Sequence, residues 1–225
     1  YDSPERVLWC GSFEGETGQS EAYLKAVRAT SHSDQYGRDF WNVYVLYAIP
    51  DEAGELNWQV LTMLADDNIY INNDEALNVE AFTNVLGHDG FKISLPVGAS
   101  GYTNLYVTRR NDGVPCVMAE LGGTGTGTME YDVDEDGSKE LIEPGGLPEY
   151  WTIYDMDPAA VWTDVYRFDI ENCGVPNLTF DAARGGFVVK DSQENVLVRY
   201  TLRKGEMLRQ SATAVTAADY PDAAG

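Results

Sequence analysis

One short acidic stretch constrains the fold of this chain more than any other feature. Residues 132–143 read Asp-Val-Asp-Glu-Asp-Gly-Ser-Lys-Glu-Leu-Ile-Glu. Oxygen-bearing side chains recur at every second position, and a glycine follows the third of them. Ca²⁺ takes roughly six to eight oxygen ligands in a flexible shell, and a tight turn needs a residue that tolerates a positive φ. The stretch therefore predicts a short loop that wraps a hard cation.

We predict five ligands in this loop, all of them oxygens. The side-chain ligands are Asp132, Asp134 and Asp136, the backbone ligand is the carbonyl of Ser138, and Glu140 closes the shell. The alternative is a solvated acidic hairpin turn that holds no ion. Six acids against one lysine give the stretch a local charge of −5. Without a cation these carboxylates repel one another and weaken the hairpin.

The same spacing also fits an EF-hand loop, with Glu143 at its last position. An EF-hand needs a helix on each side. The glycine- and threonine-rich run 122–128 comes before the loop, and Pro-Gly-Gly-Leu-Pro at 144–148 comes after it, so neither flank can be the interior of a helix. We therefore predict a strand on each side instead, over 128–131 and 140–142.

A strand–loop–strand unit of this kind resembles the calcium loops of the FG-GAP/VCBS family, the integrin-like repeats of extracellular β-propellers. The matching residues are Asp132, Asp134, Asp136, Gly137 and Glu140, followed by Leu141-Ile142. The resemblance extends over about residues 104–157, and it is specific only over 132–142. It implies an extracellular repeat protein that binds Ca²⁺ for structure. No further D-x-D-x-D-G loop occurs in the chain.

Composition narrows the classes of partner. The chain has 37 acidic against 15 basic residues and a net charge of −22. Such a surface should repel nucleic acids and anionic membranes, so we expect no nucleic-acid partner. No apolar run approaches 18 residues, so we expect no membrane insertion. We expect an extracellular or cell-surface protein whose leader is not part of this sequence.

Cysteine content adds little to this picture. Cys10, Cys116 and Cys173 are odd in number and form no C-x-x-C pair, so zinc is not expected. They allow at most one disulfide within the chain, and free buried thiols are the simpler interpretation.

The hydrophobic pattern predicts a mainly β fold of antiparallel hairpins in a meander, propeller-like or sandwich, with one or two short helices. Runs rich in β-branched and aromatic residues favour strands over 39–50, 56–64, 150–156, 161–170, 187–190 and 196–202, and in the first of these runs they occupy both faces, as in a central strand. The helices are expected over 20–29 and 73–86. Asp-Gly pairs at 89–90, 112–113 and 136–137 predict hairpin turns. We expect one domain over 1–212, with a possible subdivision near 87–90, and an extended tail over 213–225.

Two functions remain open from the sequence, beside a third possibility, an intracellular acidic domain that holds no ion. The first is a calcium-stapled binding or adhesion module for an unknown protein or glycan. The second is an extracellular glycan-active hydrolase whose calcium loop is only structural. No catalytic residue is assigned, and the carboxylates of interest beside the tryptophans are Asp155, Asp157 and Asp164.

Overall fold

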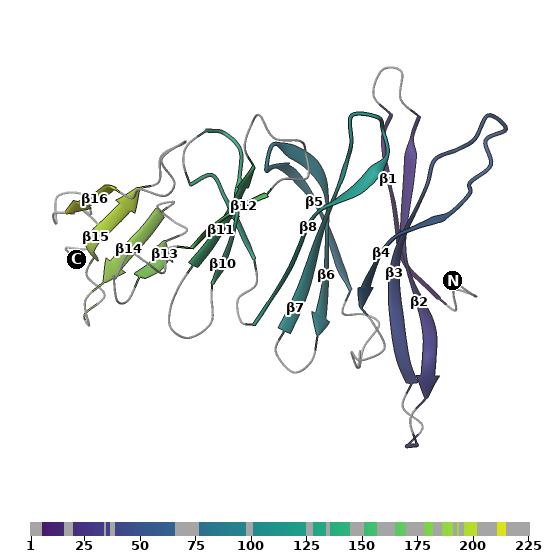
Figure 1. Ribbon diagram of the computed structural model, residues 1–225, viewed down its shortest axis with the longest axis horizontal. Helices are drawn as coiled ribbons and strands as arrows, with labels where there is room; N and C mark the ends of the chain where they lie inside the picture. Colours follow the sequence, from purple (N-terminus) through teal and green to yellow (C-terminus); the bar gives the residue numbers. More distant parts are fainter. Residues whose placement is uncertain are drawn as a thin grey trace. The chain divides into compact units, whose positions relative to one another are not determined.

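The structure is a computed structural model in which every regular element is a β-strand (Figure 1). It describes residues 6–15, 20–33, 35–36, 39–65, 77–97, 101–124, 128–133, 136–144, 151–156, 165–169, 178–181, 186–190, 193, 196–201 and 211–214. Within these residues there is no helix, and hence none long and apolar enough to cross a membrane.

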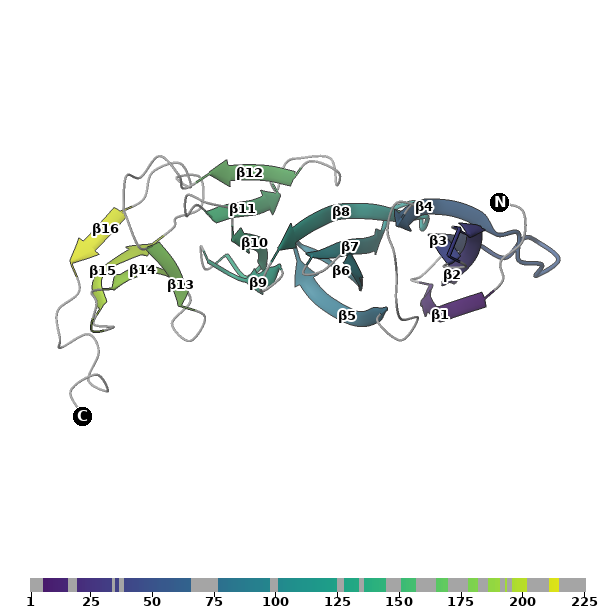
Figure 2. The ribbon, with the colours of Figure 1, turned by 90° about the horizontal axis from the view of Figure 1, so that it is seen from below.

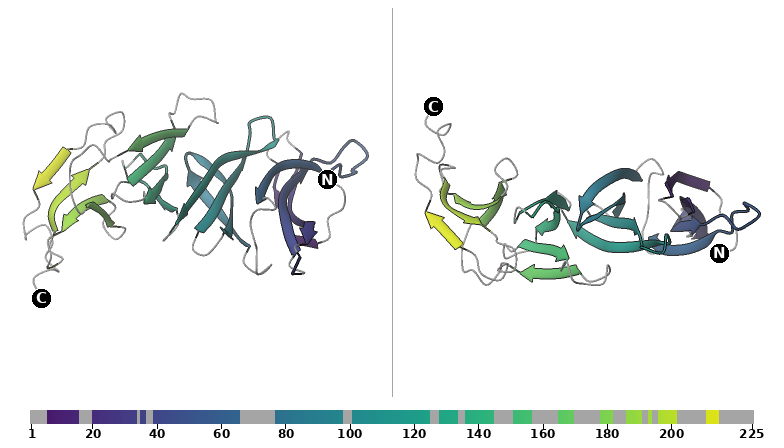
Figure 3. Two further views of the ribbon diagram at one scale, coloured as in Figure 1. Left: turned by 60° about the horizontal axis from the view of Figure 1, so that its bottom comes forward. Right: turned by 90° about the horizontal axis from the view of Figure 1, so that it is seen from above.

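In the part of the chain that the structure describes, the strands form four antiparallel sheets of four, each a meander of consecutive strands. Because each strand pairs with the next one along the chain, each sheet keeps one run of the sequence colours in Figures 2 and 3. The first two sheets comprise β1 (Arg6–Phe13), β2 (Ala22–Ser33), β3 (Asp39–Ala48) and β4 (Gln59–Ala65), then β5 (Asn78–Val85), β6 (His88–Val97), β7 (Gly101–Arg109) and β8 (Pro115–Thr124). The last two comprise β9 (Met129–Tyr131), β10 (Glu140–Pro144), β11 (Trp151–Met156) and β12 (Val165–Asp169), then β13 (Leu178–Asp181), β14 (Gly186–Lys190), β15 (Val196–Thr201) and β16 (Ser211–Ala214).

The predicted mainly β fold of antiparallel hairpins is therefore confirmed, whereas the two predicted helices are wrong. The segment 20–29 falls largely in β2, which pairs with β1 and β3. Its inward positions Ala22, Leu24 and Ala26 alternate as a strand requires. Two of these three residues are alanines, which carry a weak hydrophobic signal, so the period of two was hidden behind an apparent helical face.

The second predicted helix falls on β5 as far as the structure describes it, since residues 73–76 lie outside the described part. Here the buried residues Phe82 and Val85 stand three apart, which imitates a helix. The physical cause is Asn84, whose φ of 53° breaks the regular alternation of the strand. A left-handed residue turns the chain, so Val85 is buried although a regular strand would expose it.

The chain divides into two compact units. The first contains Tyr1–Thr83 and His88–Gly125, and the second contains Asn84–Gly87 and Thr126–Gly225. The prediction of one domain over 1–212 stays a prediction. The tail predicted over 213–225 lies outside the described residues except for 213 and 214, which end β16.

In the first unit, an apolar core joins the sheet β1–β4 to the sheet β5–β8. Its buried side chains come from the central strands of both sheets and, at Leu64, from the edge strand β4: Leu24, Val43, Val45, Leu64, Ile93, Leu95, Leu105 and Val107. Phe91 extends this core, because its ring packs against those of Trp9 and Phe13 at centroid distances of 5.2 and 5.1 Å. Sheets that bury one face in this way are stabilised mainly by the hydrophobic effect.

The second unit has its own buried residues. Leu141 and Ile142 on β10 and Val188 on β14 are 0% exposed, and Ile153 on β11 is 1% exposed. The rings of Tyr131 on β9 and Phe180 on β13 meet edge to face at 5.5 Å, which connects the two sheets of this unit.

The predicted Asp-Gly turns are correct at two of three positions. Gly113 and Gly137 have φ values of 86° and 94° and lie in turns. Gly90 instead lies inside β6, opposite Thr108 of β7. A Cβ at Gly90 would stand 2.1 Å from the carbonyl oxygen of Val107 and 2.7 Å from the ring of Phe82. Glycine is required there by close packing and not by a turn.

Gly90→Ala should therefore destabilise the protein by about 2–3 kcal/mol, because the new methyl group overlaps backbone that cannot move aside cheaply. Gly122→Ala is the matched control. That glycine is also within a strand, but its Cβ would lie 3.6 Å from the Tyr102 carbonyl oxygen, an ordinary contact. Urea unfolding of both variants measures the difference, and equal midpoints would contradict the explanation.

Candidate metal centre

The β9–β10 hairpin positions the candidate site. Tyr131 pairs with Glu140 and Met129 with Ile142, so the connecting loop comprises residues 132–139. Both flanks of the acidic stretch are strands, as predicted, and the EF-hand alternative is excluded because it needs helices there.

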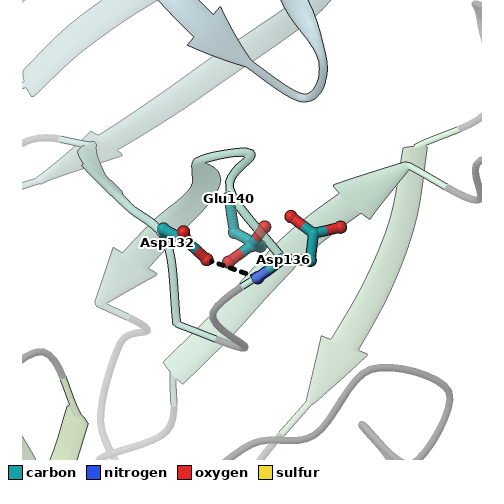
Figure 4. Close-up of side chains that lie close together, drawn as sticks. All are labelled: Asp132, Asp136 and Glu140. Carbon is teal, nitrogen blue, oxygen red and sulfur yellow. Dashed lines mark hydrogen bonds between the residues drawn. The ribbon is translucent and has the colours of Figure 1, made fainter.

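Three of the predicted ligand side chains come together in this loop (Figure 4). One carboxylate oxygen from each of Asp132, Asp136 and Glu140 lies within 4.8 Å of the other two. Asp136 is exposed and Asp132 is partly buried, whereas Glu140 is 0% exposed. The cluster therefore extends from solvent to a fully buried carboxylate at the start of β10.

Backbone N–H groups hold these carboxylates in place. Asp132 accepts two hydrogen bonds, from the N–H of Asp136 at 3.1 Å and from the N–H of Gly137 at 2.9 Å. The Ser138 N–H donates to Asp136 Oδ1 at 2.7 Å. Glu140 Oε2 accepts from the N–H of Val133 at 2.7 Å. Each bond uses a backbone donor of the loop itself, so the loop folds around its own acidic side chains.

Gly137 allows the loop to close. Its φ of 94° is disfavoured for residues with a side chain, and open space surrounds the position where a Cβ would stand. Conformation, and not lack of room, therefore explains the glycine that follows the third aspartate. The sequence argument anticipated this role.

The remaining predicted ligands have different outcomes. Asp134 lies outside the described residues. Ser138 is in the loop, and its N–H is the donor to Asp136. The assignment of Asp132, Asp134, Asp136, Ser138 and Glu140 as ligands stays a prediction, although the geometry brings three of their side chains within reach of one ion.

The donor set indicates what kind of ion could bind. All three converging groups are carboxylates, and hard oxygen donors suit Mg²⁺, Ca²⁺ or Mn²⁺ better than metals that prefer imidazole or thiolate. A buried carboxylate beside two others is also electrostatically costly, because like charges at this separation repel one another. The cluster could therefore hold a metal ion, which would offset this repulsion.

Glu143, the residue that would close an EF-hand loop, is engaged elsewhere. Its carboxylate accepts a hydrogen bond from the Tyr154 hydroxyl at 3.0 Å and one from the Thr128 hydroxyl at 3.4 Å. It therefore connects β10 to β11, and Glu140 is the glutamate that faces the loop.

Sequence reasoning missed one contributor, the segment 84–87. Its Asn84 side-chain amide donates to the Gly137 carbonyl, and its backbone pairs with Lys139. Asn84 and Gly137 are 53 residues apart. No local pattern could have revealed this contact, although the segment Asn84-Val-Leu-Gly87 contains two residue types, Asn and Gly, that tolerate left-handed turns.

The other carboxylates and the cysteines that the sequence singled out give less support for a functional site. Asp155 lies on β11 and is partly buried, whereas Asp157 and Asp164 lie outside the described residues. Cys116 is free and buried, and burial raises its pKa to about 11, so it remains a thiol at neutral pH. Cys10 is also free but is exposed, and Cys173 lies outside the described residues.

Comparison with known proteins identifies no relative. The chain matches no protein-family model, no curated protein and no solved structure. The resemblance to FG-GAP/VCBS repeats therefore rests on the loop residues alone.

Glu140→Gln should raise the stability of the metal-free protein by about 1 kcal/mol, seen as a melting temperature a few degrees higher in EDTA at pH 7. The amide oxygen can still accept from Val133, while the buried charge beside Asp132 and Asp136 is removed. Glu143→Gln is the matched control on the same strand, and it should give no such rise. A lower melting temperature for Glu140→Gln would contradict the repulsion argument.

Proposed function

We propose that the chain is an extracellular or cell-surface β module whose β9–β10 loop is stapled by one Ca²⁺, and that it serves to bind a protein or glycan. The observation that carries this proposal is the convergence of Asp132, Asp136 and Glu140 within 4.8 Å of one another. Two features of these residues support the choice of ion, and the sheet architecture supports the choice of function.

The charge arrangement supports a divalent cation. Burying an ionised carboxylate is costly unless an opposite charge or strong hydrogen bonds compensate it, and Glu140 is 0% exposed. A cation held by Asp132 and Asp136 at the exposed side would balance this buried charge. The same cation would relieve repulsion among the three acids, so ion binding would stabilise the closed loop.

Ca²⁺ is favoured over Mg²⁺ by the number and variety of oxygens available. Mg²⁺ prefers rigid octahedral sites in which water supplies several ligands, whereas Ca²⁺ accepts six to eight oxygens in irregular shells, roughly the number that a whole loop can offer. The predicted set of four side chains and the Ser138 carbonyl suits the irregular shell of Ca²⁺. Loops of this kind bind weakly enough to need the approximately millimolar Ca²⁺ found outside cells.

Sheet architecture supports a binding module. Each sheet is a four-stranded antiparallel meander, which is the unit that β-propellers repeat as blades. The integrin-like resemblance of the loop agrees with this unit. Extracellular modules of this type present loops for recognition while a rigid sheet and a structural ion hold them in place. The net charge of −22 favours partners other than nucleic acids and anionic membranes.

Calcium should raise the melting temperature of the wild type by about 3–6 °C. With a Kd of about 0.1 mM and about 1 mM free Ca²⁺, binding adds about 1.4 kcal/mol to the free energy of unfolding. Asp136→Asn should abolish the rise, because it removes one charged ligand while an amide oxygen can still accept from Ser138. The measurement is scanning calorimetry in EDTA, in Ca²⁺ and in Mg²⁺.

Asp51→Asn is the matched control for this experiment. Asp51 also accepts two backbone N–H bonds in a turn, from Ala53 and Glu55, both at 2.9 Å. It belongs to no metal-binding cluster among the described residues. This variant should keep the full response to Ca²⁺. A wild type whose melting temperature does not respond to Ca²⁺ would refute the stapled loop.

Recognition can be tested with the intact chain. Fluorescently labelled protein applied to a glycan array and to a panel of extracellular-matrix proteins should bind a defined subset in Ca²⁺. Binding should fall by about tenfold or more for Asp136→Asn if the staple supports the binding surface, and should persist for Asp51→Asn. Absence of any selective binding by folded, calcium-loaded protein would refute the binding role without affecting the loop.

A further inference from the structure

The segment 84–87, which comprises the last two residues of β5 and the turn into β6, has an unusual backbone, and we call it the turn 84–87. Three of its four residues are left-handed: Asn84, Leu86 and Gly87 have φ values of 53°, 50° and 76°. Asn and Gly tolerate this region, but a bulky residue such as Leu86 adopts it only when its surroundings hold it there. Something outside the turn must therefore stabilise it.

The second half of the acidic loop provides that stabilisation. Lys139 donates its N–H to the Asn84 carbonyl at 2.8 Å and accepts the Leu86 N–H at 2.8 Å. These two bonds form a parallel bridge between Val85 and Lys139. The Asn84 side chain adds a third bond to the Gly137 carbonyl. Val85 and Leu86 are 0% and 3% exposed, so the two middle residues of the turn are buried, whereas Asn84 and Gly87 at its ends are exposed.

The backbone of residues 137–139, which binds the turn 84–87, also shapes the candidate metal centre. The N–H of Gly137 donates to Asp132, and its carbonyl accepts from Asn84. Lys139 pairs with the turn and directly precedes the buried Glu140. A shift of residues 137–139 would therefore alter the turn contacts and the carboxylate cluster together. Residues 137–139 thus contact both the turn and the carboxylates, and each of these contacts restrains the position that the other needs.

Resting on the calcium site proposed above, we propose that the turn 84–87 is a latch for the acidic loop, and that latch docking and Ca²⁺ binding favour each other. The docked turn holds residues 137–139 where Asp132, Asp136 and Glu140 converge, so less ordering remains to be done when the ion binds. By linkage, the bound ion strengthens docking by the same factor. The ion site is thereby controlled by a segment that contributes no ligand.

Gly87→Ala tests the latch with little other disturbance. No atom lies within 4 Å of the Cβ position at Gly87, so the substitution acts only by disfavouring the left-handed backbone. Gly54→Ala is the matched control, because Gly54 has a φ of 80° and equally open space in the 51–55 turn. Calorimetric titration with Ca²⁺ should give a Kd at least about fivefold higher for Gly87→Ala and an unchanged Kd for Gly54→Ala.

A second variant keeps the test valid if Gly87→Ala fails to fold. Asn84→Gly keeps the freedom to adopt a positive φ and removes the side-chain bond to Gly137. The variant should therefore fold, and it should bind Ca²⁺ more weakly than the wild type. Amide hydrogen exchange gives a readout of docking itself. The Leu86 and Lys139 amides should exchange at least about fivefold faster in EDTA than in Ca²⁺, whereas the Gly54 amide, which donates to Asp51, should not change.

The outcomes separate this inference from the proposed function. If the wild type binds Ca²⁺ and both latch variants bind it with the wild-type Kd, the latch is refuted and the calcium site stands. If the wild type binds Ca²⁺ but the Leu86 and Lys139 amides exchange at the same rate in EDTA and in Ca²⁺, the coupling is refuted. If the wild type binds no Ca²⁺, the calcium site is refuted and the ion-linked latch with it.

Discussion

The burial of the Glu140 carboxylate is the constraint on which the organisation of the second unit depends. Glu140 begins β10 and is 0% exposed, as are the next two residues, Leu141 and Ile142. A charged group can occupy such a position only when dipoles, hydrogen bonds or an opposite charge compensate it. The loop before it supplies part of this compensation, through the Val133 N–H at 2.7 Å. The remaining electrostatic cost is what makes a cation at this point physically reasonable.

The loop is built so that its acids are oriented before any ion arrives. Asp132 accepts from the N–H groups of Asp136 and Gly137, and Asp136 accepts from that of Ser138. These bonds reduce the conformational-entropy cost of binding an ion, because the loop already holds the carboxylates close together. They also stabilise negative charge, since each places a positive dipole end at a carboxylate oxygen. Preorganisation and charge balance therefore act in the same direction.

Much of this arrangement could be predicted from residues close together in the sequence. The alternation at 39–48 and the flanks of the acidic stretch identified strands, because period-two patterning is local. The Asp-x-Asp-x-Asp-Gly spacing and the glutamate after it also pointed to three carboxylates that lie together, those of Asp132, Asp136 and Glu140, because one tight loop contains all three. The pattern failed at 22–33 and 78–85 for stated reasons: alanines weakened the alternation in β2, and left-handed Asn84 broke it in β5. Gly90 was misread as a turn because a glycine needed for close packing and one needed for a positive φ look alike in sequence.

The contribution of residues 84–87 could not be predicted, because it depends on a contact made across 53 positions. This contact changes how the acidic loop should be understood. The loop residues determine which ions can bind, since they supply the donor atoms. The positions of those atoms depend in addition on Lys139, whose backbone pairs with the turn on one side and leads into Glu140 on the other. On the proposal above, affinity is a property of the loop together with its latch, and a loop with the same sequence but no such partner should bind the same ion less tightly.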